Sequence, residues 1–369
     1  MELAPVAISW RKEVKIEYMT FQENIPLAEY TTFKIGGPAR FFCLVANEDE
    51  LLKAITFAQE KKLAIFVLGG GSNIVMSDKG FDGLVIKMEI GGIEKLKIER
   101  IERFKETKDE SVDFVVVSAG AGVMWDSLVE YAVEHNLYGI ENLSAIPGTV
   151  GAAPVQNIGA YGAEAAQTIV KVRAFDMQSM KFVELGNKEC QFTYRHSIFK
   201  ELKGRYIITR VDFKLVPNGA VNIEYRDLKE YFQKNTMPSS LTAVRAAVID
   251  IRWNKLPDWK LWGTAGSFFK NPIIRAEHYE SLKKKYPDLP GFPESSGDVK
   301  VSLGWILDKV CNMKGLCIGN VCTYEKQALV LVSKPGATSE EVIAVAQSIM
   351  KTVKEKTDID IEGEVEWVN

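Results

Sequence analysis

The chain reads Leu63-Ala64-Ile65-Phe66-Val67-Leu68-Gly69-Gly70-Gly71-Ser72-Asn73, an apolar run that leads straight into three glycines. A short continuous apolar run is typical of a buried strand. Glycine tolerates positive φ and lets the backbone approach a ligand closely, so that successive N–H groups can converge on phosphate oxygens. The spacing fits neither the GxGxxG dinucleotide pattern nor the GxxxxGKS/T phosphate loop, which excludes both motifs here. The stretch predicts a strand followed by another kind of close-approach loop, or by a flexible turn.

The segments around this stretch mix helical and extended patterns without a regular βα repeat. Asn47 can cap a helix that runs to Lys62, with Glu50 three positions after the cap. Short strands are expected at 84–86 and 114–118, and further helices at 125–136, 244–251, 302–311 and 339–356. The last segment, 359–367, alternates apolar and acidic residues and predicts a strand. Because the elements are mixed in this way, we predict an α+β protein of about three domains.

The length, composition and net charge of the chain limit the classes of protein to which it can belong. It has 369 residues, of which 46% are hydrophobic and 26% charged, an ordinary balance for a globular protein of two or three domains. A formal net charge of −3 gives no reason to expect nucleic acid or an anionic membrane as a partner, because either favours a basic patch. The sequence has neither a signal-peptide pattern nor the ~20 apolar residues of a spanning helix, so we expect a cytoplasmic protein.

Cysteine and histidine are too few and too scattered to indicate a metal cluster. The five cysteines lack CxxC spacing, which favours buried, inert thiols over a disulfide scaffold or a zinc site. The three histidines include no HExxH pair, so we expect no metal. The cysteines are Cys43, Cys190, Cys311, Cys317 and Cys322.

A second glycine-rich stretch, Ile146–Gly162, reads IPGTVGAAPVQNIGAYG. Glycines and prolines with small residues between them form neither a helix nor a regular strand. The stretch predicts a rigid surface that either a ligand or a neighbouring sheet can approach closely.

Three polar residues far apart in the sequence offer the elements of one active site. Arg195 occurs in FTYRHSIFK, Ser267 in GSFFKNP and Glu364 in IEGEV. A guanidinium stays charged and grips a carboxylate with two hydrogen bonds, and a serine hydroxyl can protonate a strongly basic enolate carbon. Taken singly, the three also fit a surface ion pair, a solvated hydroxyl and a water-facing carboxylate.

These motifs resemble the UDP-N-acetylenolpyruvoylglucosamine reductase family of bacterial cell-wall synthesis. The strand followed by GGGSN resembles the FAD pyrophosphate loop of the family, and Ile146–Gly162 matches its IPGxVGxxPxQNIGAYG pattern. FxYRxSxFK and GSFFKNP are also present, and IEGEV is similar to the LEPEV of the family. The resemblance runs from about Asn24 to Trp367 and includes the loop around Tyr225 that marks a tyrosine-containing subtype.

The resemblance implies two lobes of the vanillyl-alcohol-oxidase-like (PCMH) type, which together bind FAD non-covalently, and a third α+β domain over the substrate. The lobes would span 24–89 and 90–218, and the substrate domain 219–356. A strand within 357–369 would return to the first lobe, and residues 1–23 would form an extension. The resemblance also implies a monomer whose partners are small molecules.

The implied reaction is the NADPH-dependent reduction of UDP-N-acetylglucosamine enolpyruvate to UDP-N-acetylmuramate, in peptidoglycan precursor synthesis and so in cell-wall biogenesis, cell shape and cell division. Arg195 would face the enolpyruvyl carboxylate, Ser267 would protonate the carbon next to it, and Glu364 would belong to the same site. His196, an alternative general acid, stands at a position that the motif does not fix. Glu366 stands where the family often has arginine, which predicts a less compensated charge at Glu364.

Further residues are implied to contact the cofactor and the substrate. The implied cofactor-binding residues are Gly69, Gly70, Gly71, Ser72, Asn73, Ile146, Gly148, Gly151, Gln156, Ile158 and Gly159. The implied substrate-binding residues are Tyr161, Tyr225, Lys255, Asn271 and Gln327. Tyr225 suits a lid, because its ring offers apolar contact and its hydroxyl a hydrogen bond to phosphate.

Two other interpretations of the sequence stay open. An oxygen-using flavin oxidase can be built on the same lobes, although GSFFKNP and Glu364 have no role in it. Neither glycine-rich stretch contains the histidine or cysteine that covalent flavin attachment commonly uses. A sugar-nucleotide-binding regulator can keep the fold and lose turnover.

Overall fold

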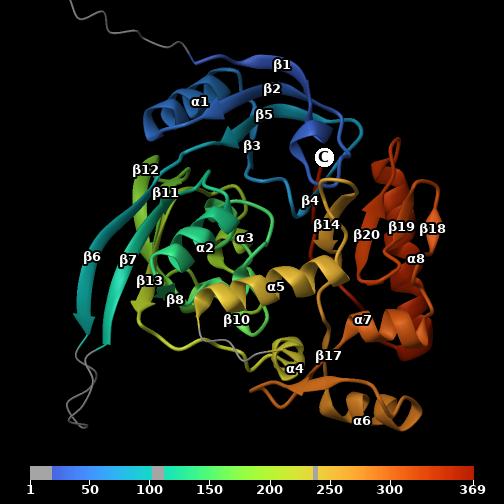
Figure 1. Cartoon of the computed structure of the whole chain (residues 1–369). Helices are drawn as coiled ribbons and strands as arrows, with labels where there is room; N and C mark the ends of the chain where they lie inside the picture. The colour runs from blue at the N-terminus through green and yellow to red at the C-terminus, as the bar shows by residue number, and fades with distance from the viewer. Residues whose placement is uncertain (1–18, 102–111, 236–239) are drawn as a thin grey trace, which may run out of the picture.

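The computed structural model describes residues 19–101, 112–235 and 240–369 (Figure 1). Within these ranges, no helix combines the length and apolar character needed to cross a membrane. Most of the extension expected at 1–23 lies outside the described residues. Its last residues are already regular structure, because strand β1 begins at Gln22.

The first lobe is a four-stranded sheet with helix α1 packed against it (Figure 1). Its order is β1 (Gln22–Pro26), β2 (Pro38–Val45), β5 (Phe81–Met88) and β3 (Ala64–Leu68). As predicted, α1 (Glu48–Glu60) is capped by Asn47, whose side-chain oxygen accepts a 2.9 Å hydrogen bond from the backbone N–H of Glu50. β3 is less buried than predicted, with Leu68 its one fully buried residue, because it is an edge strand.

The second lobe is a larger antiparallel sheet, seen at the left of Figure 1, with helix α2 (Trp125–Glu134) against it. Trp125 of α2 is buried and packs on Phe213 of the sheet. The strand order is β12 (Lys181–Gly186), β11 (Ile169–Asp176), β13 (Tyr206–Pro217), β7 (Val112–Gly120) and β6 (Ile93–Ile101), with β8 (Leu137–Tyr138) beside β13. The lobe also contains the hairpin of β9 (Gly159–Ala160) with β10 (Ala163–Glu164), and the short helix α3 (Ile198–Glu201).

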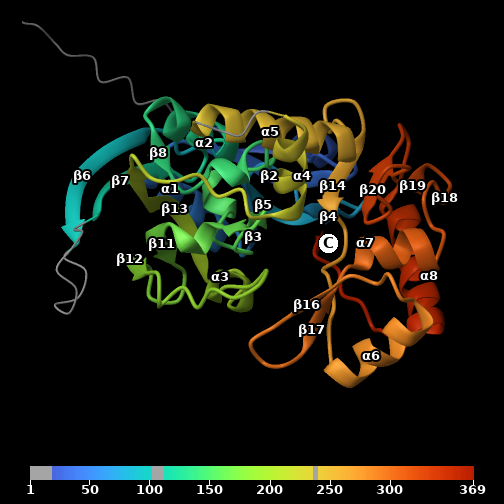
Figure 2. The same ribbon diagram turned by 60° about the horizontal axis from the view of Figure 1, so that its bottom comes forward.

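Two helices lead from the second lobe to the third. α4 (Arg226–Lys234) packs on α5 (Leu241–Lys255), which also contacts α2. Figure 1 shows α5 crossing the molecule toward β14, and Figure 2 shows it on the same side as α2. α5 confirms the helix expected at 244–251. The sequence pattern does not predict α4, because Leu228 and Phe232 are its only buried residues.

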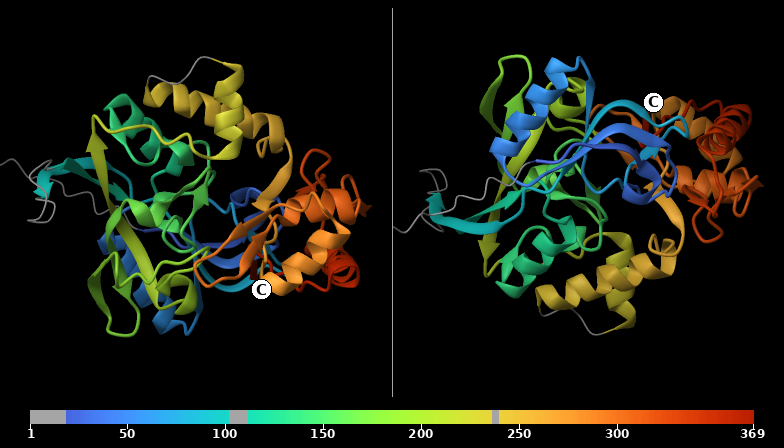
Figure 3. Two further views of the ribbon diagram at one scale, coloured as in Figure 1. Left: turned by 90° about the horizontal axis from the view of Figure 1, so that it is seen from below. Right: turned by 90° about the horizontal axis from the view of Figure 1, so that it is seen from above.

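The third lobe lies to one side of the other two (Figure 3). Helix α8 (Ser339–Thr357) confirms the helix expected at 339–356, and α7 (Leu303–Trp305) with a π-turn at 306–310 occupies the helix expected at 302–311. α6 (Ala276–Lys285) was not expected, because Leu282 is its one buried residue. One sheet has the order β14 (Gly263–Ser267), β20 (Val330–Ser333), β19 (Val321–Thr323), β18 (Cys317–Ile318), and the other β15 (Ile273–Ile274), β17 (Val299–Val301), β16 (Gly291–Pro293).

Buried hydrogen bonds join the third lobe to the first. The Thr32 hydroxyl donates to the carbonyl of Thr264 over 2.7 Å, and the Ser333 hydroxyl donates to the carbonyl of Phe33 over 2.7 Å. The Phe33 ring belongs to the apolar core of the third lobe. Strand β14, which carries Ser267, is therefore held firmly against the first lobe.

The C-terminal segment is mostly not a strand, contrary to the prediction for 359–367. Only β21 (Glu366–Val368) joins a ladder, and it runs parallel to β4 (Ile74–Met76), which follows the glycine triplet. Ile359 and Ile361 are buried in the apolar core of the third lobe. Their alternation with acidic residues therefore comes from anchoring an irregular segment, which pairs before β21 only through one antiparallel bridge between Gly363 and Phe269.

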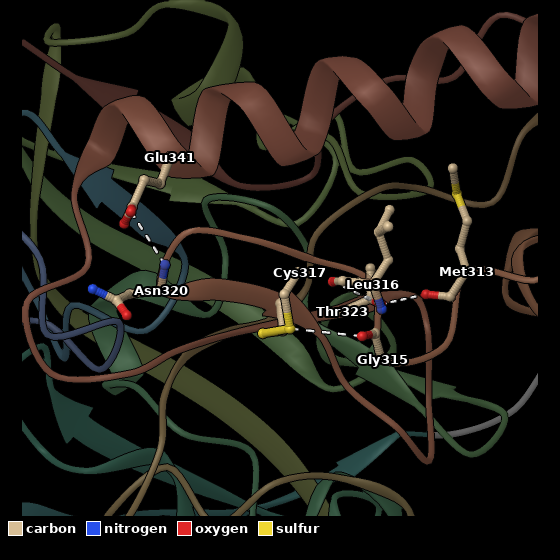
Figure 4. The surroundings of a disulfide bond; sticks show 8 residues. Met313, Gly315, Leu316, Cys317, Asn320, Thr323 and Glu341 are labelled. Atoms are coloured by element: carbon tan, nitrogen blue, oxygen red, sulfur yellow. Dashed lines mark hydrogen bonds between the residues drawn. A yellow bond between two sulfur atoms is a disulfide. The ribbon is translucent and has the colours of Figure 1, made fainter.

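One pair of cysteines does not fit the expectation of inert thiols. Cys317 and Cys322 face each other in the β18–β19 hairpin and form a disulfide, whereas the other three are buried free thiols. Figure 4 shows the hairpin beside α8, where Glu341 accepts a 3.1 Å hydrogen bond from the N–H of Asn320. The spacing is not CxxC, so only the hairpin register indicates the bond. Among the described residues, no group of His, Cys, Asp or Glu side chains could hold a metal.

Candidate active site

Arg195 and Glu364 meet in the interior, although the sequence separates them widely. Arg195 Nε lies 2.9 Å from Glu364 Oε1, and the side chains are only 17% and 11% exposed. The N–H of Nε does not point at the carboxylate, so within the described part of the chain this buried donor has no hydrogen bond. A buried charged donor without a partner is costly, and it marks a position where a ligand oxygen can bind.

A tight turn presents Arg195 to the site. Thr193 and His196 exchange backbone hydrogen bonds of 3.1 and 3.2 Å across it, and Arg195 takes a left-handed φ of 55°. That conformation costs an arginine about 1–2 kcal/mol. Side-chain contacts offset the cost, because Nη2 donates to the Gly159 carbonyl over 2.7 Å and Nη1 to the Asn157 carbonyl over 3.5 Å. The guanidinium is thereby fixed against the second glycine-rich stretch.

A β-bulge at the end of β14 positions Ser267. The pairing of β14 with β20 shifts register between Thr264 and Ser267, and Gly266 inside the bulge has a φ of 75°. A bulge with a left-handed glycine bends the strand and re-aims the next side chain. A Cβ placed on Gly266 would meet no atom within 4 Å, so the half-buried Ser267 stands beside open space.

The segment after Ser267 is bonded to the segment that carries Glu364. Phe268 and Phe269 are 1% and 2% exposed, with their rings packed edge to face, which anchors the strand end. The N–H of Glu364 donates to the carbonyl of Phe268 over 2.9 Å. Ser267 and Glu364 therefore stand on two neighbouring backbone segments. We call Arg195, Ser267 and Glu364, with Asn73 described below, the catalytic cluster.

Two lysines add positive charge around Glu364. Burial raises the pKa of the Glu364 carboxyl, and the charges of Arg195, Lys200 and Lys270 oppose that rise. Burial lowers the pKa of the Lys200 amine, and the charge of Lys270 lowers it further. The site therefore holds a carboxylate among three cationic side chains, a net positive setting that favours an anionic ligand.

Glu366 forms an ion pair at the edge of the site. Its carboxylate turns outward to Lys203, with the atoms 2.6 Å apart in a solvent-exposed ion pair. Lys203 thus pairs with Glu366, while Arg195, Lys200 and Lys270 oppose the rise in the pKa of Glu364. The weaker compensation relative to family members with arginine stays a prediction.

The two glycine-rich stretches lie directly against each other. A Cβ on Gly70 would lie 2.6 Å from the Cα of Gly148, a distance that only glycine permits. The Ser72 hydroxyl donates to the Pro147 carbonyl over 3.0 Å. The glycines are therefore needed for this contact as well as for any approach to a ligand.

Asn73 links these loops to the catalytic residues. Its side-chain N–H group donates to Gln156 Oε1 over 2.8 Å and to the Glu364 carbonyl over 3.1 Å. Its own carbonyl accepts a 3.0 Å hydrogen bond from the N–H of Glu366. One amide therefore ties the predicted pyrophosphate loop, the second glycine-rich stretch and the C-terminal segment together.

Several of the other predicted cofactor residues also have packing roles. Gly151 donates its N–H to the Ala121 carbonyl over 2.9 Å, and a Cβ there would collide with Ala121. Gly71 has a φ of 61°. The side chains of Ile146 and Ile158 pack against the apolar core that the first and second lobes share.

The groups at the first loop suit a phosphate-bearing cofactor. The Thr149 hydroxyl is buried without a hydrogen-bond partner in the described part of the chain, and a Cβ on Gly69 would lie 2.6 Å from it. A cavity of about 830 Å³ opens at Gly69 and Gly70, within the usual size of cofactor sites. An unpaired hydroxyl beside glycine backbone at the mouth of such a cavity can receive phosphate oxygens. The residues present therefore fit FAD.

Three predicted substrate-binding residues, Tyr161, Tyr225 and Lys255, gather beside α4 and α5, and we call them the tyrosine group. The two tyrosine rings meet edge to face, 5.6 Å apart. Tyr225 is 44% exposed just before α4, whereas burial raises the pKa of Tyr161 to about 12. Lys255, at the end of α5, lies 2.6 Å from Asp227 of α4 and is half exposed.

The other two predicted substrate-binding residues lie at the start of α7. Asn271 Oδ1 accepts a 3.0 Å hydrogen bond from the N–H of Leu303. The side-chain oxygen of Gln327 would lie 2.9 Å from a Cβ on Gly304. Among the described residues, no hydrogen bond or ion pair joins these two to the tyrosine group, so the structure places the predicted substrate residues in two separate groups.

Lys200, Lys270 and Thr149 are polar groups of the site that the sequence reasoning missed. Both lysines stand in the same motifs as Arg195 and Ser267, and that proximity was the available signal. Thr149 lies inside the second glycine-rich stretch. His196 lies at the surface, as expected, with its ring 3.4 Å from Glu201.

Comparison with known proteins assigns the family. A model described as FAD binding domain matches residues 39–180, and one described as UDP-N-acetylenolpyruvoylglucosamine reductase, C-terminal domain, matches residues 257–368. The UDP-N-acetylenolpyruvoylglucosamine reductase of Neisseria gonorrhoeae is 41% identical over 93% of this chain and 96% of its own length. That of Bdellovibrio bacteriovorus is 39% identical over 95% and 100%.

A solved structure shows the same fold. The crystal structure of UDP-N-acetylenolpyruvylglucosamine reductase from Thermus caldophilus matches with a TM-score of 0.63 at 24% identity, and the match covers 95% of this chain and 100% of that one. With the sequence relatives and the family models, this means that the chain is an FAD-dependent oxidoreductase of α+β fold and belongs to the UDP-N-acetylenolpyruvoylglucosamine reductase family.

Proposed function

We propose that Arg195, Ser267 and Glu364 carry out the reaction of the family in this chain: the NADPH-dependent reduction of UDP-N-acetylglucosamine enolpyruvate to UDP-N-acetylmuramate, for peptidoglycan. The observation that carries the proposal is the buried Nε–H of Arg195, which lies 2.9 Å from Glu364 Oε1 and has no hydrogen bond in the described part of the chain. A charged donor held in this way suits an oxygen that gains negative charge during a reaction.

Arg195 binds the carboxylate of the enolpyruvyl group. Two of its nitrogens already donate to the carbonyls of Asn157 and Gly159, so the guanidinium is held in one orientation. Its remaining N–H groups therefore meet the developing charge without reorganisation. Glu364 lies 2.9 Å from the same Nε, and its own charge is balanced by Lys200 and Lys270.

Ser267 holds the proton that the carbon next to the carboxylate receives. Serine is a weak acid, but a carbon with enolate character is a strongly basic acceptor. The Gly266 bulge aims the hydroxyl, and the buried Phe268 anchors the strand end behind it. When bound, FAD supplies the two-electron redox chemistry of the reaction.

The two glycine-rich stretches hold FAD without a covalent bond. Thr149 and the backbone of Gly69–Asn73 receive the pyrophosphate, and Ile146–Gly159 borders the flavin. Neither stretch contains a histidine or cysteine for covalent attachment. The flavin should therefore leave the protein on acid denaturation.

The tyrosine group binds the nucleotide part of the substrate. Tyr225 closes over it from the start of α4, against the half-buried ring of Tyr161. Lys255 meets a phosphate in place of its present contact with Asp227. Asn271 and Gln327 approach the same substrate from the third lobe.

The proposal extends to the domain division and to partners. The pairing of β21 with β4 supports a first lobe made of 24–89 and 357–369. The second lobe then spans 90–218 and the substrate domain 219–356. We further propose a monomer that acts in the cytoplasm without nucleic acid, because the substrates are small metabolites and the net charge is −3.

The visible spectrum of the purified protein tests this function. NADPH should bleach the flavin in the absence of oxygen, and the enolpyruvyl sugar nucleotide should restore its colour. Rapid reoxidation by oxygen, with no response to the sugar nucleotide, would instead identify an oxidase. A flavin that NADPH does not reduce would identify a binding protein without turnover.

A further inference from the structure

The turn that carries Arg195 is fastened to the second glycine-rich stretch at both of its ends. At the first end, the side-chain amide of Asn157 donates a 3.1 Å hydrogen bond to the carbonyl of Thr193. At the other end, the hydroxyl of Ser197 donates one of 2.6 Å to the carbonyl of Val155. Asn157 and Ser197, which we call the turn clamp, are 1% and 0% exposed. The turn therefore cannot shift without breaking a buried hydrogen bond, which is costly.

Asn157 is itself held in one orientation. Its Nδ2 group also donates to Glu164 Oε2 over 2.8 Å, and its Oδ1 accepts a 2.9 Å hydrogen bond from the N–H of Ala166. Its left-handed φ of 45° is a conformation that asparagine adopts more readily than most residues. The two amide hydrogens and the amide oxygen therefore already have partners inside the protein.

The same stretch also holds the guanidinium of Arg195. The carbonyls of Asn157 and Gly159 accept hydrogen bonds from Nη1 and Nη2 over 3.5 and 2.7 Å. A Cβ on Gly159 would lie 2.9 Å from Nη1, so a side chain at that position would press on the guanidinium. The backbone of the turn and the tip of the arginine are thus anchored to one short segment, 155–159. The position of Arg195 Nε, 2.9 Å from Glu364 Oε1, depends on this common anchor.

We propose that the turn clamp positions Arg195 for the reaction, with Asn157 and Ser197 acting through the guanidinium and touching neither substrate nor cofactor. The inference rests on the proposed function. Arg195 has a left-handed φ of 55°, a strained conformation that its surroundings must enforce. The clamp bonds lie two residues before and two residues after Arg195, where they can enforce it. A charged group preset in this way meets developing negative charge without reorganisation.

Loss of either clamp residue should slow one half-reaction. Asn157→Gly keeps the left-handed backbone without strain and deletes the amide. Oxidation of the reduced flavin by the enolpyruvyl substrate should fall about tenfold to a hundredfold, because a misplacement of about 1 Å can cost that much. Ser197→Ala deletes one hydrogen bond and should slow the same step about twofold to tenfold. Reduction of the flavin by NADPH and the amount of bound FAD should stay close to their wild-type values, as stopped-flow and absorption spectra can measure.

A double-mutant cycle distinguishes positioning of Arg195 from general support of the fold. Arg195→Lys removes the planar fork that the clamp orients. In that background, Asn157→Gly or Ser197→Ala should therefore cause little further loss in flavin oxidation. Full addition of the separate losses overturns the inference. So does equal slowing of both half-reactions by the clamp variants, or slowing of neither, because the two residues would then support only the flavin stretch or the fold.

Asn187 provides a matched control. Its amide donates to the carbonyls of Ala166 and Ile169 over 2.8 Å each, and among the described residues it has no hydrogen bond to the Arg195 turn. Asn187→Gly should lower Tm without altering either half-reaction. If Asn157→Gly is too unstable to purify, Ser197→Ala and its cycle with Arg195→Lys decide the question. A wild-type flavin that the enolpyruvyl substrate does not reoxidise would defeat the proposed function, whereas additive losses in an active enzyme overturn this inference alone.

Discussion

The catalytic cluster and the tyrosine group are held in place by different kinds of contact. In the cluster, backbone hydrogen bonds and one amide join segments from all three lobes, and the charged side chains are largely buried. The tyrosine group has an edge-to-face ring contact and a half-exposed ion pair. Partly exposed contacts of that kind contribute little stability. Under the proposed function, the difference means that the reacting groups are positioned before the substrate arrives, while the residues that grip the nucleotide can still adjust.

The fixed and the adjustable parts of the molecule meet between α5 and α4. Arg245 of α5 binds Asp126 of α2 through two hydrogen bonds of 2.6 and 2.9 Å, which fixes α5 to the second lobe. α4 contacts α5 through its two buried residues, Leu228 and Phe232, and through the partly exposed Asp227–Lys255 ion pair. The adjustable part is therefore α4 with the preceding Tyr225. Fixed groups favour transition-state stabilisation, and adjustable ones favour entry and release of substrate.

Removal of the Ser267 hydroxyl should have the largest effect, because it deletes a fixed reacting group. In Ser267→Ala, NADPH should still reduce the flavin at nearly the normal rate. Oxidation of the reduced flavin by the enolpyruvyl substrate should fall by at least about 100-fold, the low end of what a positioned acid contributes. Stopped-flow measurement of the two half-reactions separates these rates.

Ser267→Cys is the matched variant, because a thiol can also donate a proton and should recover part of the loss. If Ser267→Ala slows both half-reactions alike, the residue acts in the structure and not as the acid. Glu364 would then be the next proton donor to test.

Loss of the Tyr225 hydroxyl should have a smaller effect, confined to substrate binding. One neutral hydrogen bond is worth about 0.5–1.5 kcal/mol, so Tyr225→Phe should raise the KM for the sugar nucleotide about twofold to tenfold. Reduction of the flavin by NADPH should change less. Tyr231→Phe, on the α4 helix that follows Tyr225, is the control and should leave both unchanged. Equal losses in both half-reactions for Tyr225→Phe would remove the contrast between the two regions.

The smallest expected effect is on stability and concerns the buried charge of the cluster. Folding raises the pKa of the Glu364 carboxyl above its unfolded value of 4.5. The carboxyl therefore contributes to folding stability in full below pH 4.5, and this contribution is lost as the pH rises through the folded-state pKa. Arg195, Lys200 and Lys270 face the carboxyl and limit the rise. In Glu364→Gln, Tm should therefore fall less between pH 4.5 and neutral pH than in the wild type.

The variant and the wild type should differ in their total fall in Tm by less than the ~2–4 °C that 1 kcal/mol produces in a domain of about 150–250 residues. Thermal unfolding followed by circular dichroism across that pH range measures it. A steeper fall in the variant than in the wild type would show that the carboxyl is stabilised, not destabilised, by its folded surroundings.

Elements governed by neighbouring residues were predicted well from the sequence. The Asn47 cap of α1 needs only Asn47 and Glu50, and α5 and α8 show a strong apolar period. α4 and α6 escaped prediction because each buries so few apolar residues that no period is visible. The strand expected at 359–367 was wrong because alternation does not reveal whether a partner strand exists.

The candidate site likewise has features that the sequence indicates and features that it does not. The resemblance to family motifs selected Arg195, Ser267 and Glu364, because residue chemistry alone also fits a surface ion pair, a solvated hydroxyl and a water-facing carboxylate. Their catalytic roles stay predictions. The unpaired Nε of Arg195, the Cys317–Cys322 bond and the cavity at Gly69 could not be read from the chain. Each depends on the distance and orientation of groups that only the packing of strands and lobes brings together, and local sequence carries no record of that geometry.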